Sequence, residues 1–551
     1  MKLVIIGAVA AGTSAAAKAR RNDETAEITI YEKDTDISYS GCGMPYYLGG
    51  LIRRREDLSP RNPAYFRDKY NVDIRTGHEV LALHPDRKTL TVRNLTTGQV
   101  FDDAYDTLIL ATGARAVMPP VPGLALPHVF PLRTLGDMNR IDAFIKSHNP
   151  NQAVILGTGF IGLECCESLS GLGMQVTLVE KLPQVTPGLD ADMARLVGDH
   201  LREKGIPVHL DNGVARVEAA HVVLSDESSL PADLVIVATG IRPNVALAEA
   251  AGIRLGPTGA IAVDERLQTS LPHILACGDC IEQTHLVTGK PVYRPLGSTA
   301  NKTGRIAGDV ATGGSLTFHG ILGTGIFRLF DRTVAQTGLS EREAVAAGYD
   351  VVVSHNIKPD RPEYMGGREM TIKSVADRAT GRLLGVQIVG EAGVDKRIDV
   401  FATAITFGAR AEDLFHLDLA YAPPFSTTKD PVHYTGMILE NALHRNRPLL
   451  SADALAQMIE SGQPYTLIDA RVEKQYEAGH IPTAHSVPQD RLRQAAETLD
   501  PDVPVVTYCN KGVTGNAAQN ILLGKGIRTV FNLSGGYRMY TVRKRQDHGT
   551  V

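Results

Sequence analysis

The sequence contains one local pattern twice: an apolar run, a glycine-rich turn, a helix-forming stretch of small residues, and a second apolar run that ends in glutamate. The second copy is complete, since residues 153–156 lead into Gly157-Thr158-Gly159-Phe160-Ile161-Gly162 and the next run ends at Glu180. A strand that turns into a helix through GxGxxG binds a dinucleotide, because glycine lets the backbone approach the pyrophosphate at the helix N-terminus. The chain is therefore expected to contain a parallel α/β unit of the Rossmann type.

The acid that ends the second strand indicates which nucleotide is bound. Glu180 would accept a hydrogen bond from a ribose 2′-hydroxyl and repel a 2′-phosphate, which favours NADH, while Lys181 leaves NADPH acceptable. We predict cofactor contacts in this copy from Gly157, Gly159, Ile161, Gly162, Glu180 and Gly240.

The first copy starts at the N-terminus, where a buried strand at 2–6 precedes Gly7-Ala8-Val9-Ala10-Ala11-Gly12. Its second strand, 28–32, ends in Glu32, and Val9 replaces the middle glycine. Each copy is followed by an apolar run that ends in Thr-Gly, at Thr112-Gly113 and at Thr239-Gly240, which indicates an internal duplication. Two copies predict two bound dinucleotides.

Composition limits the class of protein. A chain of 551 residues with 43% hydrophobic and 21% charged residues is expected to form two to four globular domains. A net charge of −4 argues against a general nucleic-acid partner. Six cysteines do not make a disulfide framework, and no apolar run reaches the length of a membrane span. We therefore expect a cytoplasmic protein without a membrane partner.

Cys42 lies in a turn rich in glycine and tyrosine, residues 38–47, just after the first copy. The residue five positions later is Tyr47, so this turn cannot close a disulfide of its own and must exchange one with a small thiol or cycle through a sulfenic acid. A reactive thiolate needs a lowered pKa, which we expect from nearby cations and a helix N-terminus. The alternative is a buried, inert cysteine.

Four other cysteines are expected to pack in cores. Cys277 and Cys280 form a CxxC, but no second CxxC or histidine cluster accompanies it, so no metal site is predicted. Cys165 and Cys166 lie in the helix after the second fingerprint, where small apolar residues serve equally well.

Taken in order, the two fingerprints, the two Thr-Gly strand ends and Gly278-Asp279 resemble the pyridine nucleotide–disulfide oxidoreductases over roughly residues 1–445. The resemblance implies an FAD-binding domain at 1–112 and 240–320, an NAD(P)H-binding domain at 113–239 and an α+β dimerisation domain at 321–445. In the last we predict strands near 324–330, 350–357, 370–376 and 384–389, and helices near 341–347 and 395–407. The FAD contacts that it implies are Gly7, Ala8, Val9, Gly12, Glu32, Lys33, Val80, Thr112, Gly113, Gly278 and Asp279.

Within that family, residues 38–50 look like the coenzyme A disulfide reductase branch, whose single cysteine forms a mixed disulfide with coenzyme A. The resemblance also matches Tyr421 to a tyrosine that reaches the cysteine of the partner subunit, with Tyr364 as a second candidate phenol, and so implies a homodimer with a shared active site. Gly41 replaces the asparagine that is common before this cysteine. The coenzyme A contacts implied are Ser14, Lys18, Arg21, Ser38, Arg61, Asn301 and Arg305.

The last hundred residues, 446–551, resemble an α/β rhodanese sulfurtransferase domain through Ile468-Asp469-Ala470-Arg471, Gly479-His480-Ile481-Pro482, the Cys509 loop and Leu533-Ser534-Gly535-Gly536-Tyr537. Cys509 looks exposed between a strand and a helix, where backbone N–H groups can surround a persulfide. Thr514 replaces the usual loop arginine, and Lys511 is expected to supply a cation.

Together these features predict an FAD enzyme that uses NAD(P)H to reduce coenzyme A persulfide, polysulfide or coenzyme A disulfide at Cys42, with Cys509 handling sulfane sulfur. Two alternatives stay open. One is an NADH oxidase or peroxidase that works through a sulfenic acid at Cys42. The other is a reductase whose rhodanese domain only senses or docks.

Overall fold

The computed structural model describes residues 1–547, so the last four positions of the predicted 446–551 domain lie outside the described residues. The chain divides into two compact units. Unit 1 contains residues 1–181 and 211–323, and unit 2 contains residues 182–210 and the chain from 324 onward. The four sequence-predicted domain boundaries stay a prediction.

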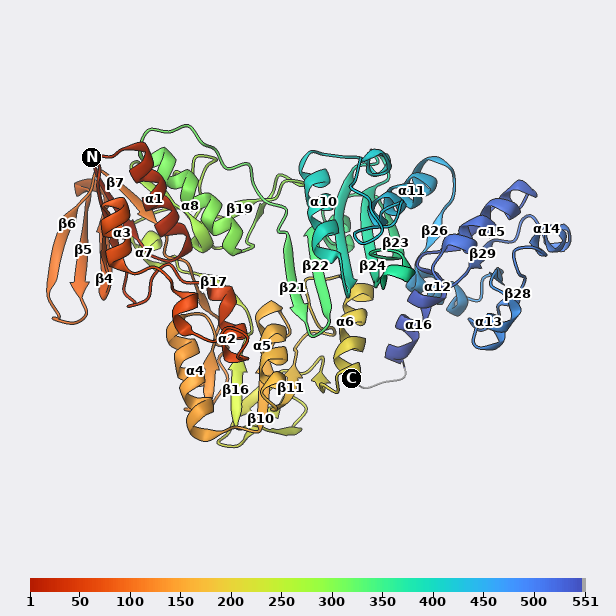
Figure 1. Cartoon of the computed structure of the whole chain (residues 1–551), viewed down its shortest axis with the longest axis horizontal. Coiled ribbons are helices and arrows are strands. Elements are labelled where there is room, and N and C mark those ends of the chain that lie inside the picture. The colour runs from red at the N-terminus through yellow and green to blue at the C-terminus, as the bar shows by residue number, and fades with distance from the viewer. Residues whose placement is uncertain (548–551) are drawn as a thin grey trace. The chain divides into compact units, whose positions relative to one another are not determined.

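The first sheet of unit 1 is parallel, with strand order β18-β7-β1-β2-β3. Its central strand is buried from Leu3 to Ile6, as expected for an apolar run between two covered faces. The helices α1 and α8 lie side by side next to it (Figure 1). The elements are β1 (Lys2–Ile6), α1 (Ala10–Asn22), β2 (Glu27–Tyr31), β3 (Asp73–Arg75), β7 (Thr107–Leu110), β18 (Ile274–Ala276) and α8 (Gly297–Ala311).

The second sheet repeats this arrangement, since its central strand pairs in parallel with the strand after its helix and with the strand that precedes Thr-Gly. The predicted duplication is therefore confirmed at the level of strand pairing. The repeated elements are β9 (Val129–Pro131), α4 (Leu135–His148), β10 (Gln152–Leu156), α5 (Phe160–Gly171), β11 (Gln175–Val179) and β16 (Leu234–Val237).

Helices α1 and α8 approach closely because small residues face each other. A Cβ added at Gly304 would lie 2.2 Å from the carbonyl oxygen of Ala11, and one at Gly308 would lie 2.2 Å from that of Ala15. Any larger residue at either position would push the helices apart. This contact places the outer faces of α1 and α8 on one surface.

Unit 2 holds an antiparallel sheet of order β21-β22-β25-β24-β23. Four of its strands and both predicted helices match the sequence prediction, whereas β22 and α11 were not predicted. The elements are α6 (Ala191–Glu203), β21 (Gly325–Leu329), β22 (Arg332–Gly338), α9 (Glu341–Ala346), β23 (Val351–Pro359), β24 (Glu369–Asp377), β25 (Leu383–Gly390), α10 (Val394–Thr406) and α11 (Pro431–His444).

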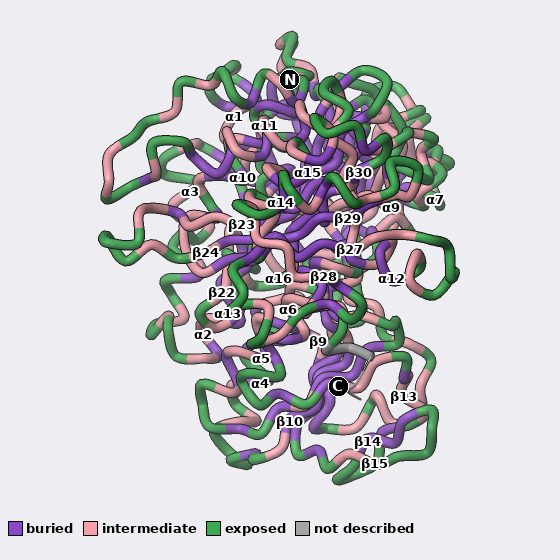
Figure 2. Tube along the Cα trace, turned by 90° about the vertical axis from the view of Figure 1, so that its right-hand side faces the viewer, coloured by how far each residue is buried: buried purple, intermediate pink, exposed green. Residues whose placement is uncertain are grey.

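The C-terminal part of unit 2 is a parallel sheet of order β26-β30-β29-β27-β28, and its central strand β29 is buried throughout (Figure 2). The side chain of Ser451 accepts a hydrogen bond from the Ala454 N–H and so caps the helix that follows β26. The elements are β26 (Leu449–Leu450), α12 (Ala452–Glu460), β27 (Thr466–Asp469), β28 (His485–Ser486), β29 (Val505–Tyr508), α15 (Val513–Gly524), β30 (Val530–Leu533) and α16 (Gly536–Asp547).

Across residues 1–547, none of the helices is both long enough and apolar enough to cross a bilayer. The mixed α/β architecture agrees with the fold class that the sequence predicts.

Candidate functional site

Two glycine-rich turns, residues 7–12 and 157–162, follow the carboxyl ends of β1 and β10, and each is called a glycine cradle. A Cβ at Gly12 would lie 1.8 Å from the Gly7 carbonyl oxygen, and a Cβ at Gly162 would lie 2.1 Å from that of Gly157. Only glycine therefore allows each helix to start so close to its strand. At Gly159 a Cβ would meet nothing within 4 Å, so the space above this turn is open. Both turns fit a dinucleotide pyrophosphate.

Glu32 and Glu180, the two acids predicted to bind a ribose, accept hydrogen bonds from the backbone of these turns. Glu32 accepts a hydrogen bond from the Ala8 N–H at 2.8 Å, and Glu180 accepts from the Thr158 N–H at 2.9 Å and from its hydroxyl at 2.8 Å. Both carboxylates are buried, and burial raises the pKa of Glu32. Each acid thus fixes the shape of its own turn, a contact that sequence reasoning missed.

The strand ends that carry Thr-Gly are equally open. Gly113 and Gly240 have φ values of +66° and +109°, and a Cβ at either would meet no atom within 4 Å. The Thr112 hydroxyl donates to the Asn244 carbonyl at 2.7 Å. Such left-handed turns favour glycine and leave room for a ligand beside the backbone.

Three further residues that were predicted to contact a cofactor, Asp279, Lys33 and Val80, lie outside the glycine turns. Asp279 accepts a hydrogen bond from Arg133 at 2.7 Å, next to Gly278 in a short 3₁₀ turn. Lys33 is exposed. Val80 is 7% exposed in β4 (His78–His84), so any contact it makes with a cofactor has to come from its backbone.

Cys42 lies in a 3₁₀ turn, Gly41–Gly43, that leads directly into α2 (Met44–Leu48). This short helix packs on α5, the helix after the second fingerprint, because a Cβ at Gly49 would come within 3.0 Å of Ser168. The Tyr46 hydroxyl donates to Glu164 of α5 at 3.0 Å. All six cysteines lie among the described residues, and Cys42 is the one that is exposed.

The surroundings of Cys42 raise the pKa of its thiol instead of lowering it. The Cys42 side chain is exposed, yet the protein around its sulfur still desolvates it, and this burial raises the pKa of Cys42. The Glu164 carboxylate raises it further, while the Arg133 guanidinium opposes both. Burial also raises the pKa of Glu164 to about 7. The surroundings of Cys42 in this structure thus raise its pKa, which is the opposite direction to the lowering that the sequence predicts.

Most predicted coenzyme A contacts gather on the shared surface of α1 and α8. The Ser14 hydroxyl donates to Asn301 at 2.8 Å, which joins the two helices directly. Lys18 lies one turn further along α1 and forms an ion pair with Asp309 at 3.0 Å. Arg305 is exposed one turn beyond Asn301. Ser38 has a φ of +49° and donates its N–H to the Ala8 carbonyl at 2.8 Å, beside the first cradle.

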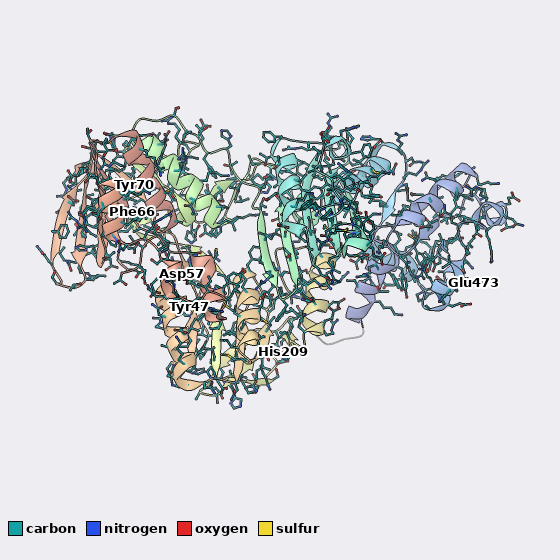
Figure 3. The ribbon with its side chains drawn as sticks, in the orientation of Figure 1. Tyr47, Asp57, Phe66, Tyr70, His209 and Glu473 are labelled. Carbon is teal, nitrogen blue, oxygen red and sulfur yellow. The ribbon has the colours of Figure 1, made fainter. Side chains whose placement is uncertain are left out.

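Arg21 and Arg61 each lie over a tyrosine ring of α3 (Pro63–Tyr70). Figure 3 labels Phe66 and Tyr70 of this helix. The Arg21 guanidinium lies 5.7 Å from the Tyr70 ring centre, and that of Arg61 lies 5.8 Å from the Tyr65 ring centre. Aromatic faces attract cations at this distance. Sequence reasoning missed both tyrosines.

The neighbouring Arg20 has a different function. It is 4% exposed and its guanidinium donates to five backbone carbonyls between Asp23 and Asn71, so it holds the loop after α1 in place. Of the three basic residues between positions 18 and 21, Arg20 is therefore structural, Lys18 is half-buried in its ion pair, and Arg21 is exposed.

The two candidate phenols belong to unit 2. The Tyr364 side chain is 76% exposed and that of Tyr421 is 48% exposed. Neither hydroxyl has a hydrogen-bond partner among the described residues. Phe425 and Phe407 are also exposed, at 70% and 84%.

The expectation that Cys509 is exposed is wrong, because its side chain is 6% exposed. Its sulfur accepts the Gly512 N–H at 3.2 Å, as expected for a loop that surrounds a thiolate with backbone donors. A cavity of about 730 Å³ opens in front of it. Lys511 lines this cavity but is held in an ion pair with Glu369 of β24, so it does not supply the free cation that was expected.

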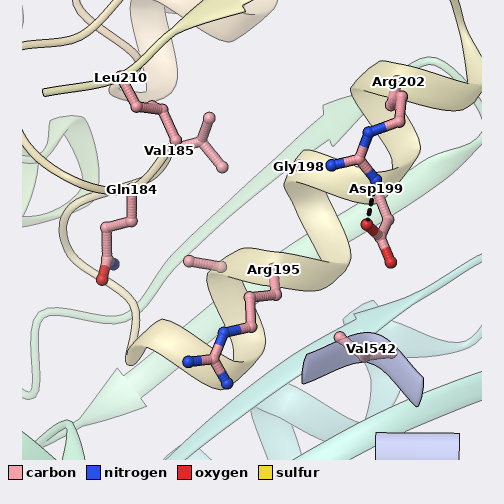
Figure 4. A pocket seen from close by; sticks show the side chains of 9 residues that line it. Gln184, Val185, Arg195, Gly198, Asp199, Arg202, Leu210 and Val542 are labelled. Atoms are coloured by element: carbon pink, nitrogen blue, oxygen red, sulfur yellow. Dashed lines mark hydrogen bonds and ion pairs between the residues drawn. The ribbon is translucent and has the colours of Figure 1, made fainter. Parts of the chain in front are cut away.

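A second hollow lies beneath α6, between Arg195, Gly198 and Val542 (Figure 4). Its volume of about 20 Å³ is room for about one water. It is therefore too small to be a ligand site.

The four remaining cysteines are buried, which confirms the packing interpretation. Cys165, Cys166, Cys277 and Cys280 are all 2% exposed or less.

Comparison with known proteins decides the family. Residues 1–296 match the model of the pyridine nucleotide-disulphide oxidoreductases, and residues 326–431 match the dimerisation domain of the same proteins. The chain belongs to the pyridine nucleotide-disulphide oxidoreductase family. Residues 451–542 match the rhodanese-like domain. Family membership implies FAD and a pyridine nucleotide, and the two glycine cradles fit them.

Relatives match either the first four-fifths of the chain or nearly all of it. A coenzyme A disulfide reductase of Staphylococcus haemolyticus is 33% identical over 436 residues, which cover 79% of this chain and 98% of the relative. The crystal structure of reduced Bacillus anthracis CoADR-RHD is 36% identical with a TM-score of 0.96, covering 99% of this chain and 98% of that one. An NAD-dependent persulfide reductase from A. fulgidus is 36% identical with a TM-score of 0.91, covering 98% and 100%.

Proposed function

We propose that this protein uses NAD(P)H and FAD to reduce coenzyme A persulfide or polysulfide, and coenzyme A disulfide, at Cys42. The observation that carries the proposal is that Cys42 is an exposed thiol without a cysteine partner, in the unit that holds both dinucleotide cradles. A single thiol forms a disulfide only by exchanging with the sulfur of a second molecule. The names of the relatives, a coenzyme A disulfide reductase and a persulfide reductase, support this substrate class.

The chemistry at Cys42 is thiol–disulfide exchange. The Cys42 thiolate attacks the inner sulfur of the persulfide, which is the thiol sulfur of coenzyme A itself. The S–S bond of the persulfide breaks, and hydrosulfide leaves with the bonding electron pair. FAD, when bound, supplies the two electrons from NAD(P)H that cleave the resulting mixed disulfide. Cys42 returns to a thiolate and coenzyme A leaves as a thiol.

The cations of unit 1 support coenzyme A as the carrier. Lys18 and Arg305 lie on the shared face of α1 and α8, and Arg21 and Arg61 lie on the tyrosines of α3. Phosphates of a nucleotide thiol would be held by such charges. Ser14 and Asn301 lie on the same face of α1 and α8, whereas Ser38 lies beside the first glycine turn, and their predicted roles belong to this proposal.

The C-terminal domain supports sulfur transfer as a second activity. Cys509 is held by a backbone N–H donor at the mouth of a cavity and precedes α15, whose N-terminus favours a negatively charged sulfur. We propose that Cys509 accepts sulfane sulfur as a persulfide and delivers it to a thiol.

Two exposed phenols and the dimerisation domain support a homodimer. We propose that Tyr421 reaches Cys42 of the partner subunit and protonates the leaving thiolate, with Tyr364 as a second phenol nearby. Six free cysteines suit a reducing compartment, so we expect the enzyme in the cytoplasm.

The decisive experiment is anaerobic turnover of NADH with coenzyme A persulfide, polysulfide, coenzyme A disulfide and hydrogen peroxide as separate acceptors. We expect persulfide to be reduced fastest and Cys42→Ser to abolish reduction of every disulfide-type acceptor. Faster turnover of peroxide, with a sulfenic acid trapped at Cys42, would establish the oxidase or peroxidase alternative instead.

A further inference from the structure

The Cys509 cavity is lined by two different domains of unit 2. Most lining residues come from the rhodanese domain, but Ile357 and Lys358 come from β23 of the antiparallel sheet. The rhodanese domain is docked on this sheet by specific contacts. The His355 N–H donates to the Ser534 hydroxyl at 2.7 Å, and Lys511 pairs with Glu369. Lys358 therefore faces the sulfur-transfer loop because of this docking.

Four basic side chains line the cavity, but two of them are neutralised. Arg471 is bound by both oxygens of Asp469, at 2.6 to 3.0 Å, and also donates to the Gly479 carbonyl. Lys511 is bound by Glu369. Among the side chains that the structure describes, which end at residue 544, Lys358 and Arg493 have no carboxylate partner. These two cations are available to a ligand.

Lys358 is held in position by an aromatic ring rather than by an acid. Its ammonium lies 3.8 Å from the ring centre of Tyr434 in α11, and the side chain is half-buried. Burial lowers the pKa of Lys358, and the charge of Lys511 lowers it further, whereas the Cys509 sulfur opposes them. Lys358 and Cys509 line the same cavity. Thr514, at the usual arginine position, also lines the cavity but carries no charge.

We propose that Lys358, from outside the rhodanese domain, completes the sulfur-transfer site by binding the anionic end of a small sulfane-sulfur donor, together with Arg493. This inference rests on the proposed activity of Cys509 and names the donor class, a thiosulfonate or persulfide anion. The Cys509 thiolate attacks the outer sulfur, the S–S bond of the donor breaks, and sulfite or a thiolate leaves with the electron pair. Lys358 transfers no proton and acts by charge.

The test uses the full-length protein and measures sulfur transfer to cyanide from thiosulfate, a dianion, and from a neutral dialkyl trisulfide. We expect Lys358→Met to raise KM for thiosulfate about tenfold, with a smaller change in kcat, because an unscreened charge near the donor is lost. KM for the trisulfide should stay within about twofold, since that donor has no charge to bind. Arg493→Met should show the same split, and Lys358→Arg should restore most of the affinity for thiosulfate.

Two controls distinguish a failure of the role assigned to Lys358 from a failure of the proposed activity of Cys509. Lys525→Met removes an exposed cation at the C-terminal end of α15 that does not line the cavity, and it should leave both KM values unchanged. Cys509→Ser should abolish transfer from both donors. If Cys509→Ser leaves transfer intact, the proposed activity of Cys509 is wrong. If Cys509→Ser abolishes transfer but Lys358→Met matches the wild type, or weakens both donors equally, the assignment of Lys358 is wrong.

Discussion

At the scale of single residues, the Glu164 carboxylate acts on the pKa of Cys42. Glu164 holds the Tyr46 hydroxyl at 3.0 Å and raises the pKa of Cys42. Since the pKa of Glu164 is itself about 7, this carboxylate changes charge in the physiological range. The sequence identifies Cys42 from its turn, but it cannot reveal Glu164, because that contact depends on the packing of α2 against α5.

We predict that Glu164→Gln makes Cys42 more reactive above neutral pH. The wild-type carboxylate becomes negative as the pH rises through about 7 and then disfavours the thiolate, whereas glutamine stays neutral. At pH 8 alkylation of Cys42 by iodoacetamide should be about two- to tenfold faster in the variant. Glu249→Gln, on an exposed helix, is the matched control. Equal rates in wild type and Glu164→Gln at pH 8 would refute this coupling.

Gly159 provides a test of the second cradle. Its φ is −72° and a Cβ would meet no protein atom, so Gly159→Ala should change the free energy of unfolding by less than about 1 kcal/mol. The added methyl would occupy the space reserved for the pyrophosphate, so KM for NADH should rise at least about tenfold while FAD content stays unchanged. Gly171→Ala, at the end of the same helix and equally open, should leave KM for NADH unaltered. A normal KM for NADH in Gly159→Ala would mean that the nucleotide does not bind over this turn.

At the scale of elements, α6 is attached to the antiparallel sheet by a buried ionic cluster. Lys373 of β24 is 2% exposed and contacts Asp190 at 3.2 Å, Asp192 at 2.9 Å and Glu341 at 2.6 Å. His355 adds a hydrogen bond to Asp192 at 2.7 Å. Burial alone would raise the pKa of Asp192, but His355 and Lys373 outweigh it and lower that pKa well below its ordinary value.

We predict that Lys373→Met destabilises unit 2 by about 3–5 kcal/mol at pH 7, because it leaves buried carboxylates without their cation. The folded pKa of Asp192 is lowered, so its contribution is complete above the unfolded value of about 3.9 and is lost as the pH falls. The difference between variant and wild type should therefore shrink below about pH 4. Denaturant midpoints at pH 7 and pH 3 measure both effects.

Lys525→Met removes an exposed ion pair with Glu497 and should change the free energy of unfolding by less than about 1 kcal/mol. A Lys373→Met protein as stable as this control at pH 7 would contradict the assignment of the cluster as a buried attachment.

The elements also show what a single sequence can predict. The buried strands beside the fingerprints were predicted because their apolar runs are continuous. β22 was missed because only two of its residues are strongly apolar, Val334 and Ala335, and its strand character comes from pairing on both sides with β21 and β25. α11 was missed although Asp430-Pro431 is a helix start signal, since Asp430 caps the helix in the structure.

At the scale of the whole molecule, the sequence predicts each site but not the relation between domains. The position of Lys358 at the Cys509 cavity depends on how the rhodanese domain docks on β23, which no local pattern encodes. The proposed dimer depends in the same way on surfaces that only the fold assembles, such as the exposed Phe425 and Phe407.

We predict that the protein sediments at twice its 59.3 kDa mass. Phe425→Asp, which places a charge in the exposed aromatic surface near Tyr421, should shift the protein toward monomer at low micromolar concentration. Leu95→Asp, at an exposed position in unit 1, is the control that should leave the mass unchanged. Sedimentation velocity on the three proteins distinguishes these outcomes, and a wild-type monomer would contradict the shared active site.

Intact mass spectrometry of the purified protein measures whether Cys42 exchanges sulfur with coenzyme A. We predict an adduct of the mass of coenzyme A that maps to Cys42, is released by NADH under anaerobic conditions, and is absent from Cys42→Ser. An adduct of oxygen alone at Cys42, or a coenzyme A adduct that persists in Cys42→Ser, would contradict the account.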